Sequence, residues 1–179
     1  MSRISKNDWL EIGLLTLSTE GVQGLTIDAL TRKLSVTKGS FYHHFKNYEA
    51  YKNGLLEFWN EQYTERIVAF SENYQDESQI FSRFVSIISS ESPAVEIAIR
   101  AWAFQDEQVQ AYVQQTDQLR IAFAQQWFQK TLLDAEKAKT HAVLLNAVLI
   151  GCYSHFPAVH GDDLQKLLSD FFLLMDIRI

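Results

Sequence analysis

Residues 37–46, with the sequence TKGSFYHHFK, gather hydrogen-bond donors of the kind that contact DNA. The first of them suit base edges in the major groove, because Lys38 can donate to guanine and Thr37 can touch a thymine methyl or accept a hydrogen bond. The later donors suit the sugar-phosphate backbone. A helix beginning here adds free N–H groups and partial positive charge at its start, and Gly39 allows close approach. The side-chain donors are Thr37, Lys38, Ser40, Tyr42, His43, His44 and Lys46.

Two short helices and a tight turn are predicted to position these donors. Thr26 can cap the first helix, whose apolar residues recur every three or four positions up to Leu34. Ser35 then begins a short connection, and a second helix follows in which Phe41 and Phe45, four residues apart, can pack inward. Two helices that meet at a steep angle across a short turn form a helix-turn-helix.

Another helix is predicted to precede this pair. Ser5 and Asp8 have the spacing of a capping box, and Gly21 is a suitable end for the helix. Its expected apolar face consists of Trp9, Ile12, Leu15 and Leu17.

From Ser5 through Trp59, about a third of the chain, the sequence resembles the DNA-binding domain of the TetR family of bacterial transcriptional regulators. The hallmark is a turn-helix of the type TKGSFYHHF followed by a Lys and an acidic residue. The resemblance implies an all-α fold: a three-helix helix-turn-helix DNA-binding head, residues 1–47, then a helical ligand-sensing and dimerisation body, residues 48–179. The chain departs from the family pattern at Thr31, at residues 47–48 and at Tyr51, which affects packing more than the DNA face.

The resemblance also implies roles for particular residues. Phosphate contacts are expected from Thr26, Thr37, Tyr42, His43, His44 and Lys46, and base approach at Lys38, Gly39, Ser40 and Phe41. The expected partner is a near-palindromic double-stranded DNA operator bound by a homodimer, and repression is the usual outcome in the family. An unidentified small-molecule effector is expected in the body.

Charge is distributed unevenly between the two expected parts. Residues 1–53 contain seven Lys or Arg against five Asp or Glu, whereas the remainder contains nine against seventeen. The overall net charge is -6, but the segment that is expected to bind DNA therefore has a net positive charge. A balance of only +2 predicts weak non-specific affinity and reliance on a dimer.

The rest of the sequence predicts further helices near 48–74, 78–91, 93–104, 106–131, 134–156 and 162–177. The last two are apolar over more of their circumference than one core face needs, so a second chain could cover the surplus; a large core is the alternative. The resemblance, to a family that dimerises through its last two helices, favours a homodimer. The expected interface residues are Leu145, Val148, Leu149, Cys152, Leu168, Phe171, Phe172 and Met175.

Aromatic residues of the body are candidates to line a ligand pocket, although aromatic residues at helical spacing are more often plain core. Arg100 lies in an apolar helix and should need a partner such as Glu96 or Asp117, or could bind an acidic ligand. The candidate ligand-binding residues are Trp59, Tyr63, Phe84, Arg100, Trp102, Phe104, Phe123 and Trp127.

Enzymatic activity is not expected. His141, His155 and His160 are too irregularly spaced for a metal-ligand pair, and we expect no metal and no cofactor. The single cysteine, Cys152, fits a reducing cytoplasm, and the longest apolar run is too short to span a membrane. The main competing hypothesis is a helical dimeric interaction protein that keeps the fold but binds another regulator instead of DNA.

Overall fold

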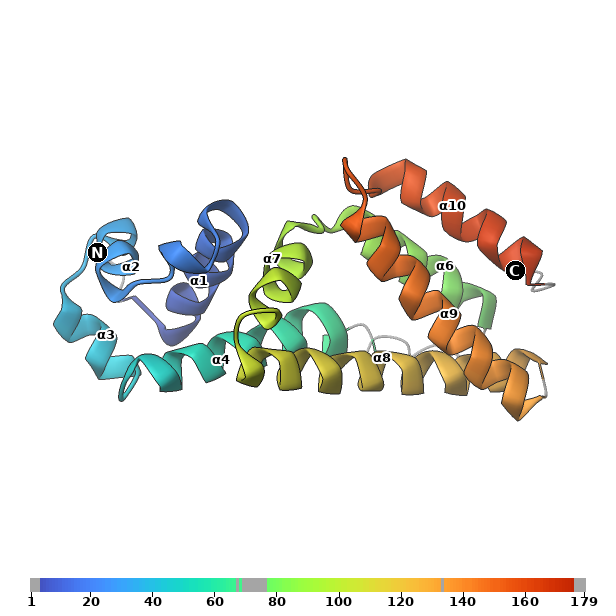
Figure 1. The fold of residues 1–179 in the computed structure, drawn as a ribbon, viewed down its shortest axis with the longest axis horizontal. Coiled ribbons are helices and arrows are strands. Elements are labelled where there is room, and N and C mark those ends of the chain that lie inside the picture. The colour runs from blue at the N-terminus through green and yellow to red at the C-terminus, as the bar shows by residue number, and fades with distance from the viewer. Residues whose placement is uncertain (1–3, 67, 69–76, 133, 176–179) are drawn as a thin grey trace. The chain divides into compact units, whose positions relative to one another are not determined.

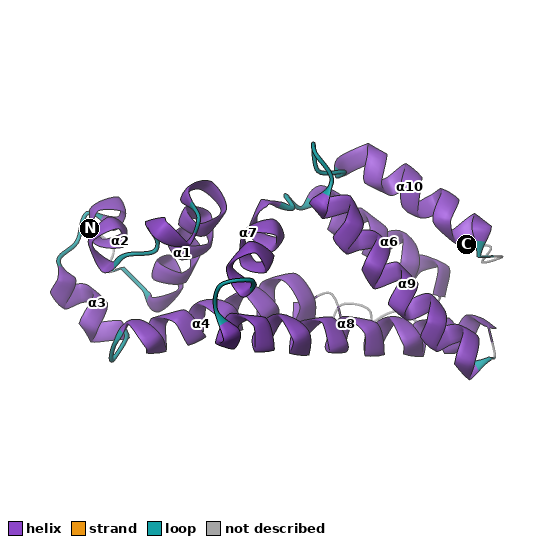
Figure 2. Cartoon of the chain, viewed as in Figure 1, coloured by secondary structure: helices purple, strands orange, loops and turns teal. Residues whose placement is uncertain are grey.

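The computed structural model describes residues 4–66, 68, 77–132 and 134–175 (Figure 1). The chain divides into two compact units. The first unit contains Met1–Tyr63 and Ala94–Val113, and the second contains Thr64–Pro93 and Gln114–Ile179. The described residues form nine α-helices, one 3₁₀ turn and one π-helical turn, with no strand among them (Figure 2). The predicted all-α fold is therefore confirmed. The functional boundary predicted between residues 47 and 48 stays a prediction, because compact packing does not show which residues bind DNA.

The first unit holds the helix-turn-helix and the helices that support it. A 3₁₀ turn at Val22–Gly24 follows the first helix, and a π-helical turn, η2 (Glu61–Glu65), follows the fourth. The α-helices of this unit are α1 (Lys6–Glu20), α2 (Ile27–Leu34), α3 (Lys38–His44), α4 (Tyr48–Asn60), α7 (Ala94–Ala103) and the beginning of α8 (Glu107–Leu132).

The start of α1 confirms the predicted capping box. The backbone N–H of Asp8 donates to Ser5 Oγ at 3.2 Å, and the backbone N–H of Ser5 donates to Asp8 Oδ2 at 2.6 Å. These bonds satisfy donors that a helix start leaves without intrahelical partners. The bond from the Ser5 N–H, together with one that the Ser5 hydroxyl donates to Asp8 Oδ2 at 2.8 Å, lowers the pKa of the Asp8 carboxyl.

The core of the first unit surrounds α1, which packs against α2, α4 and α7. Trp9 is fully buried, as are Tyr51 and Trp59 of α4 and Ile99 of α7. Leu15 does not belong to this core, contrary to the prediction, because its side chain is 56% exposed. The buried face of α1 instead combines Trp9 and Leu17, as expected, with Leu10, Gly13 and Leu14.

The second unit has its own core. It contains the later part of α8 together with α6 (Glu77–Ser90), α9 (Ala135–Ser154) and α10 (Gly161–Leu174). Phe128 of α8 and Phe172 of α10 are fully buried, and their rings stack with centroids 5.9 Å apart. Helix α10 also packs against α6.

The predicted helices 78–91, 93–104, 106–131 and 134–156 correspond to α6, α7, α8 and α9 within two residues at either end. The predicted helix 162–177 corresponds to α10, and residues 176–177 lie outside the described part of the chain. For the predicted helix 48–74, α4 ends at Asn60 and η2 follows it, while residues 67 and 69–74 lie outside the described part. No helix within the described ranges is both long enough and apolar enough to cross a membrane.

Candidate nucleic-acid interface

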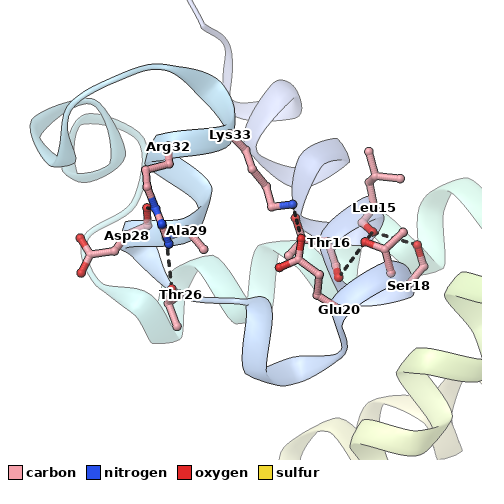
Figure 3. Close-up of polar contacts among 10 residues, drawn as sticks. Leu15, Thr16, Ser18, Glu20, Thr26, Asp28, Ala29, Arg32 and Lys33 are labelled. Carbon is pink, nitrogen blue, oxygen red and sulfur yellow. Dashed lines mark hydrogen bonds and ion pairs between the residues drawn. The ribbon is translucent and has the colours of Figure 1, made fainter.

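The predicted helix-turn-helix is present at α2 and α3. Thr26 Oγ1 accepts a hydrogen bond from the backbone N–H of Ala29 at 3.1 Å, so Thr26 caps α2 as predicted (Figure 3). Ser35 ends α2 in the left-handed conformation, with φ 55° and ψ 42°. The backbone N–H of Val36 then returns to the Thr31 carbonyl at 3.0 Å. Thr37 therefore stands at the N-cap position of α3 after a connection of two residues, and its hydroxyl makes no capping hydrogen bond.

Aromatic packing holds α3 from its inner side. The Phe41 ring is fully buried, with its centroid 5.4 Å from that of Trp9 and 5.5 Å from that of Tyr51. Phe45, one turn later, is 3% exposed and lies beside the same Tyr51 ring. This arrangement differs from the expectation that Phe41 contacts DNA. Its side chain cannot reach a base, because the spacing that it shares with Phe45 directs both rings into the core.

The outer side of α3 presents the predicted donors to solvent. Tyr42 is 56% exposed, and a Cβ at Gly39 would meet only the Thr37 hydroxyl at 3.5 Å, an ordinary contact. Packing within the protein therefore does not require glycine at position 39, and the surface above it is open. The exposed members of the predicted set are Thr26, Thr37, Lys38, Gly39, Tyr42, His43 and Lys46.

His44 and Ser40 are only half-buried, and His44 already has a partner within the protein. Its Nε2 lies 3.0 Å from the carbonyl oxygen of Ile4, forty residues earlier. This contact fastens the segment before α1 to the end of α3. The expected phosphate contact by His44 stays a prediction.

Ion pairs connect the helices that flank the turn. Lys33 of α2 pairs with Glu20 at the end of α1, and Lys38 Nζ lies 2.6 Å from Asp28 Oδ1. A hydrogen bond to Asp28, assisted by the charge of that carboxylate, raises the pKa of Lys38. Arg32 Nε donates to the main-chain carbonyl of Asp28 at 3.2 Å (Figure 3). Residue spacing does not predict this role of Asp28, because its position beside Lys38 depends on how the turn folds α3 back onto α2.

The candidate ligand residues are divided between the two units. Trp59 and Trp102 are buried in the core of the first unit, whereas Phe104 is 89% exposed. Arg100 Nε donates to Glu96 Oε1 at 2.8 Å, which confirms Glu96 as the expected partner. Tyr63 and Arg100 also belong to the first unit, and Phe84, Phe123 and Trp127 belong to the second. Their role in binding a ligand stays a prediction. In the described ranges, no group of three or more His, Cys, Asp or Glu is arranged to hold a metal ion.

Half of the expected interface residues are covered by the chain's own core. Leu145, Cys152, Leu168 and Phe172 are at most 7% exposed, so they leave almost no surface for a second chain to cover. Burial also raises the pKa of the Cys152 thiol. The other four, Val148, Leu149, Phe171 and Met175, are half-buried.

Helices α9 and α10 also carry exposed apolar side chains, which lie on the helix surface beside the buried ones. Leu144 is 44% exposed, Leu167 37% and Leu174 88%. Leu167 and Leu174 line a groove of 400 Å³ together with charged side chains of α10. The complete lining is Val148, Asp163, Lys166, Leu167, Asp170, Phe171 and Leu174.

A capped helix, a two-residue connection and a second helix that turns exposed donors outward define this molecule as a helix-turn-helix DNA-binding protein. Residues 14–50 match the family model described as bacterial regulatory proteins, tetR family. The helix-turn-helix segment is therefore that of the TetR family of DNA-binding transcriptional regulators, whose members are not enzymes.

Solved structures show the same fold. A transcriptional regulator of the TerR/AcrR family from Aquifex aeolicus VF5 superposes with a TM-score of 0.69 at 17% identity, over 95% of this chain and 98% of that one. The reduced form of E. coli NemR superposes with a TM-score of 0.67 at 19% identity, over 96% of this chain and 92% of that one. No curated protein matches the sequence.

Proposed function

We propose that this regulator is a repressor that binds a near-palindromic operator as a homodimer and is released by a small molecule. The exposed outer side of α3 is the observation that carries the DNA-binding part. Lys38, Tyr42 and Lys46 are exposed there, while Phe41 and Phe45 fix the helix from beneath. Rigid support of exposed donors suits recognition in the major groove. The proposed place of action is the bacterial cytoplasm, where operator DNA lies.

The proposed dimer uses the groove on α9 and α10. A side chain as exposed as Leu174 gains burial only from a partner, and Leu167 beside it adds apolar surface. A two-fold dimer also provides the second DNA-binding unit that a near-palindromic operator requires.

Release by a ligand requires differential binding. An effector must bind the dimer that cannot contact DNA more tightly than the dimer that can. A hundredfold relief of repression corresponds to about 2.7 kcal/mol of differential affinity. Aromatic side chains of the second unit, such as Phe84 and Trp127, would suit a planar or apolar molecule.

The test is fluorescence anisotropy of the purified protein with a duplex selected from a random-sequence pool and a scrambled duplex, across a salt series. We expect tight, salt-sensitive binding to the selected duplex with two protomers or a multiple per site. Tyr42→Ala and Lys46→Ala should weaken it, and Lys46→Ala should lower the salt slope by about 1 for each phosphate that is no longer neutralised.

Lys139→Ala is the matched control, because Lys139 is an exposed lysine on α9 in the second unit. Equal weakening by Lys46→Ala and Lys139→Ala would contradict the assigned surface. Absence of sequence-selective binding by the unsubstituted protein would favour the interaction protein that binds another regulator.

A further inference from the structure

We propose that Asp28 is a selectivity residue, whose carboxylate holds the Lys38 ammonium and opposes binding to DNA that is not the operator. This inference rests on the proposed function, in which the outer side of α3 meets DNA. Lys38 Nζ lies 2.6 Å from Asp28 Oδ1, and the two residues come from different helices on either side of the turn. Both side chains are largely exposed, at 59% for Lys38 and 66% for Asp28.

The pair contributes little to the fold. Ion pairs as exposed as this one are screened by water and salt. Leu30 and Phe41 are fully buried on α2 and α3, and Thr26 already caps the helix that carries Asp28. Asp28 lies in the first turn of α2, where a carboxylate is favourable with or without Lys38, so the ion pair itself is not needed to hold α3 in place.

The electrostatic effect of the pair falls instead on DNA binding. Non-specific binding depends on phosphate neutralisation by Lys and Arg, and Asp28 neutralises Lys38 before DNA arrives. If Lys38 turned to a phosphate, the Asp28 carboxylate would be left facing a polyanion. A guanine edge instead offers Lys38 an uncharged acceptor, and a neighbouring cytosine amino group offers Asp28 a donor. Such a sequence satisfies both side chains, whereas a phosphate satisfies only Lys38.

The experiment compares the unsubstituted protein with Asp28→Asn on the selected and scrambled duplexes. Asp28→Asn should raise affinity for the scrambled duplex roughly tenfold near physiological salt and steepen its salt slope by about 2 per dimer, one phosphate from each protomer. Affinity for the selected duplex should change less than about twofold, because two effects oppose each other. The variant frees Lys38, but it replaces the carboxylate that accepts a hydrogen bond from cytosine with a weaker amide acceptor. The selectivity ratio therefore falls several-fold, and Asp28→Glu should restore it.

The Lys38→Met variant shows whether Lys38 is responsible. In a Lys38→Met background, Asp28→Asn should leave the scrambled affinity unchanged, because no ammonium remains to be freed. Glu11→Gln is the matched control: it removes one exposed carboxylate from α1, outside the helix-turn-helix. Circular dichroism should show the same helix content for every variant.

Each contrary result has a definite meaning. An unchanged selectivity ratio in Asp28→Asn, or a gain on scrambled DNA that persists without Lys38, would overturn the role of Asp28 and leave the regulator intact. Failure of the unsubstituted protein to enrich any sequence from the pool would overturn the proposed function and this inference together.

Discussion

The Lys52 ammonium lies 3.1 Å from the Asp106 carboxylate and so joins α4 to the start of α8. Lys52 also lies 2.9 Å from Glu49, one turn earlier on α4. Asp106 Oδ1 accepts hydrogen bonds from the backbone N–H groups of Gln108 and Val109, at 3.0 and 3.2 Å. One carboxylate therefore caps α8 and holds the helix that directly follows the helix-turn-helix.

Replacing Lys52 tests the strength of this connection. The Lys52 side chain is 10% exposed and that of Asp106 is 26% exposed, so Lys52→Met leaves a partly buried carboxylate without its ammonium. We expect the free energy of unfolding to fall by about 1–2 kcal/mol, at or below the low end of the range for hydrogen bonds to charged groups, because the pair is only partly buried. Urea unfolding followed by circular dichroism measures it. Lys139→Met, at an exposed site on α9, should be within about 0.5 kcal/mol of the unsubstituted protein. Similar losses in both variants would contradict the assignment.

The same pair predicts a pH dependence. Burial alone raises the pKa of Asp106, but hydrogen bonds from Lys52 and the Val109 N–H, with the Lys52 charge, outweigh it and hold the pKa below the ordinary value. This contribution to stability is therefore present above about pH 4, the ordinary Asp value, and is lost as the pH falls through the folded-state pKa. When urea midpoints are measured across a pH series, the midpoint of Asp106→Asn should therefore fall less at acid pH than the midpoint of the unsubstituted protein. Unchanged acid sensitivity would contradict the prediction.

On the alkaline side, Lys52 behaves in the opposite sense. Burial alone lowers its pKa, but hydrogen bonds to Glu49 and Asp106 outweigh that effect and raise it. Its contribution is complete below about pH 10.4, the ordinary Lys value, and disappears as the pH rises through the folded-state pKa. As the pH rises above that value, the urea midpoint of the unsubstituted protein should therefore fall more than the midpoint of Lys52→Met.

Gly13 allows α1 to approach α4 closely. A Cβ at this position would overlap the Tyr51 hydroxyl and come within 2.9 Å of Leu55 Cδ1. Tyr51 is fully buried, and its hydroxyl donates to the Trp9 carbonyl at 3.3 Å, so it cannot move away freely. Gly13→Ala should therefore destabilise the protein by about 1–3 kcal/mol despite the better helix propensity of alanine.

Gly54→Ala, on α4 in the same unit, is the control for that change. Its Cβ would meet Leu10 and Phe45 at 3.7 Å, an ordinary contact. We expect Gly54→Ala to be neutral or to stabilise the helix by up to about 1 kcal/mol. Thermal unfolding measures the stability of both variants. A destabilised Gly54→Ala with an unaffected Gly13→Ala would contradict the close packing of Gly13 against Tyr51.

Leu174→Glu tests the proposed dimer surface. Leu174 lines the groove of α10, and a carboxylate there would lose favourable burial beneath a second chain. We expect the dimer dissociation constant in sedimentation equilibrium to rise at least about tenfold, which is about 1.4 kcal/mol. Leu173→Glu is the control, because Leu173 is 66% exposed but does not line the groove. A monomeric unsubstituted protein at micromolar concentration would refute the dimer itself.

The sequence alone determined the helix-turn-helix and its supports. Ser5 with Asp8, and Thr26, cap their helices through bonds that span three residues, and the paired rings of Phe41 and Phe45 follow from spacing along one helix. Such local geometry is set by neighbours in the chain, so residue types and spacing are enough to predict it.

Tertiary structure decided what depends on distant partners. Leu144 and Leu145 are adjacent on α9, yet Leu145 is buried and Leu144 is 44% exposed. The packing of the other helices decides which side of α9 is covered. Lys52 meets Asp106 across 54 residues, and Lys38 meets Asp28 only after Ser35 turns the chain. Periodicity shows that a helix has an apolar side but not which part of that side its own chain covers.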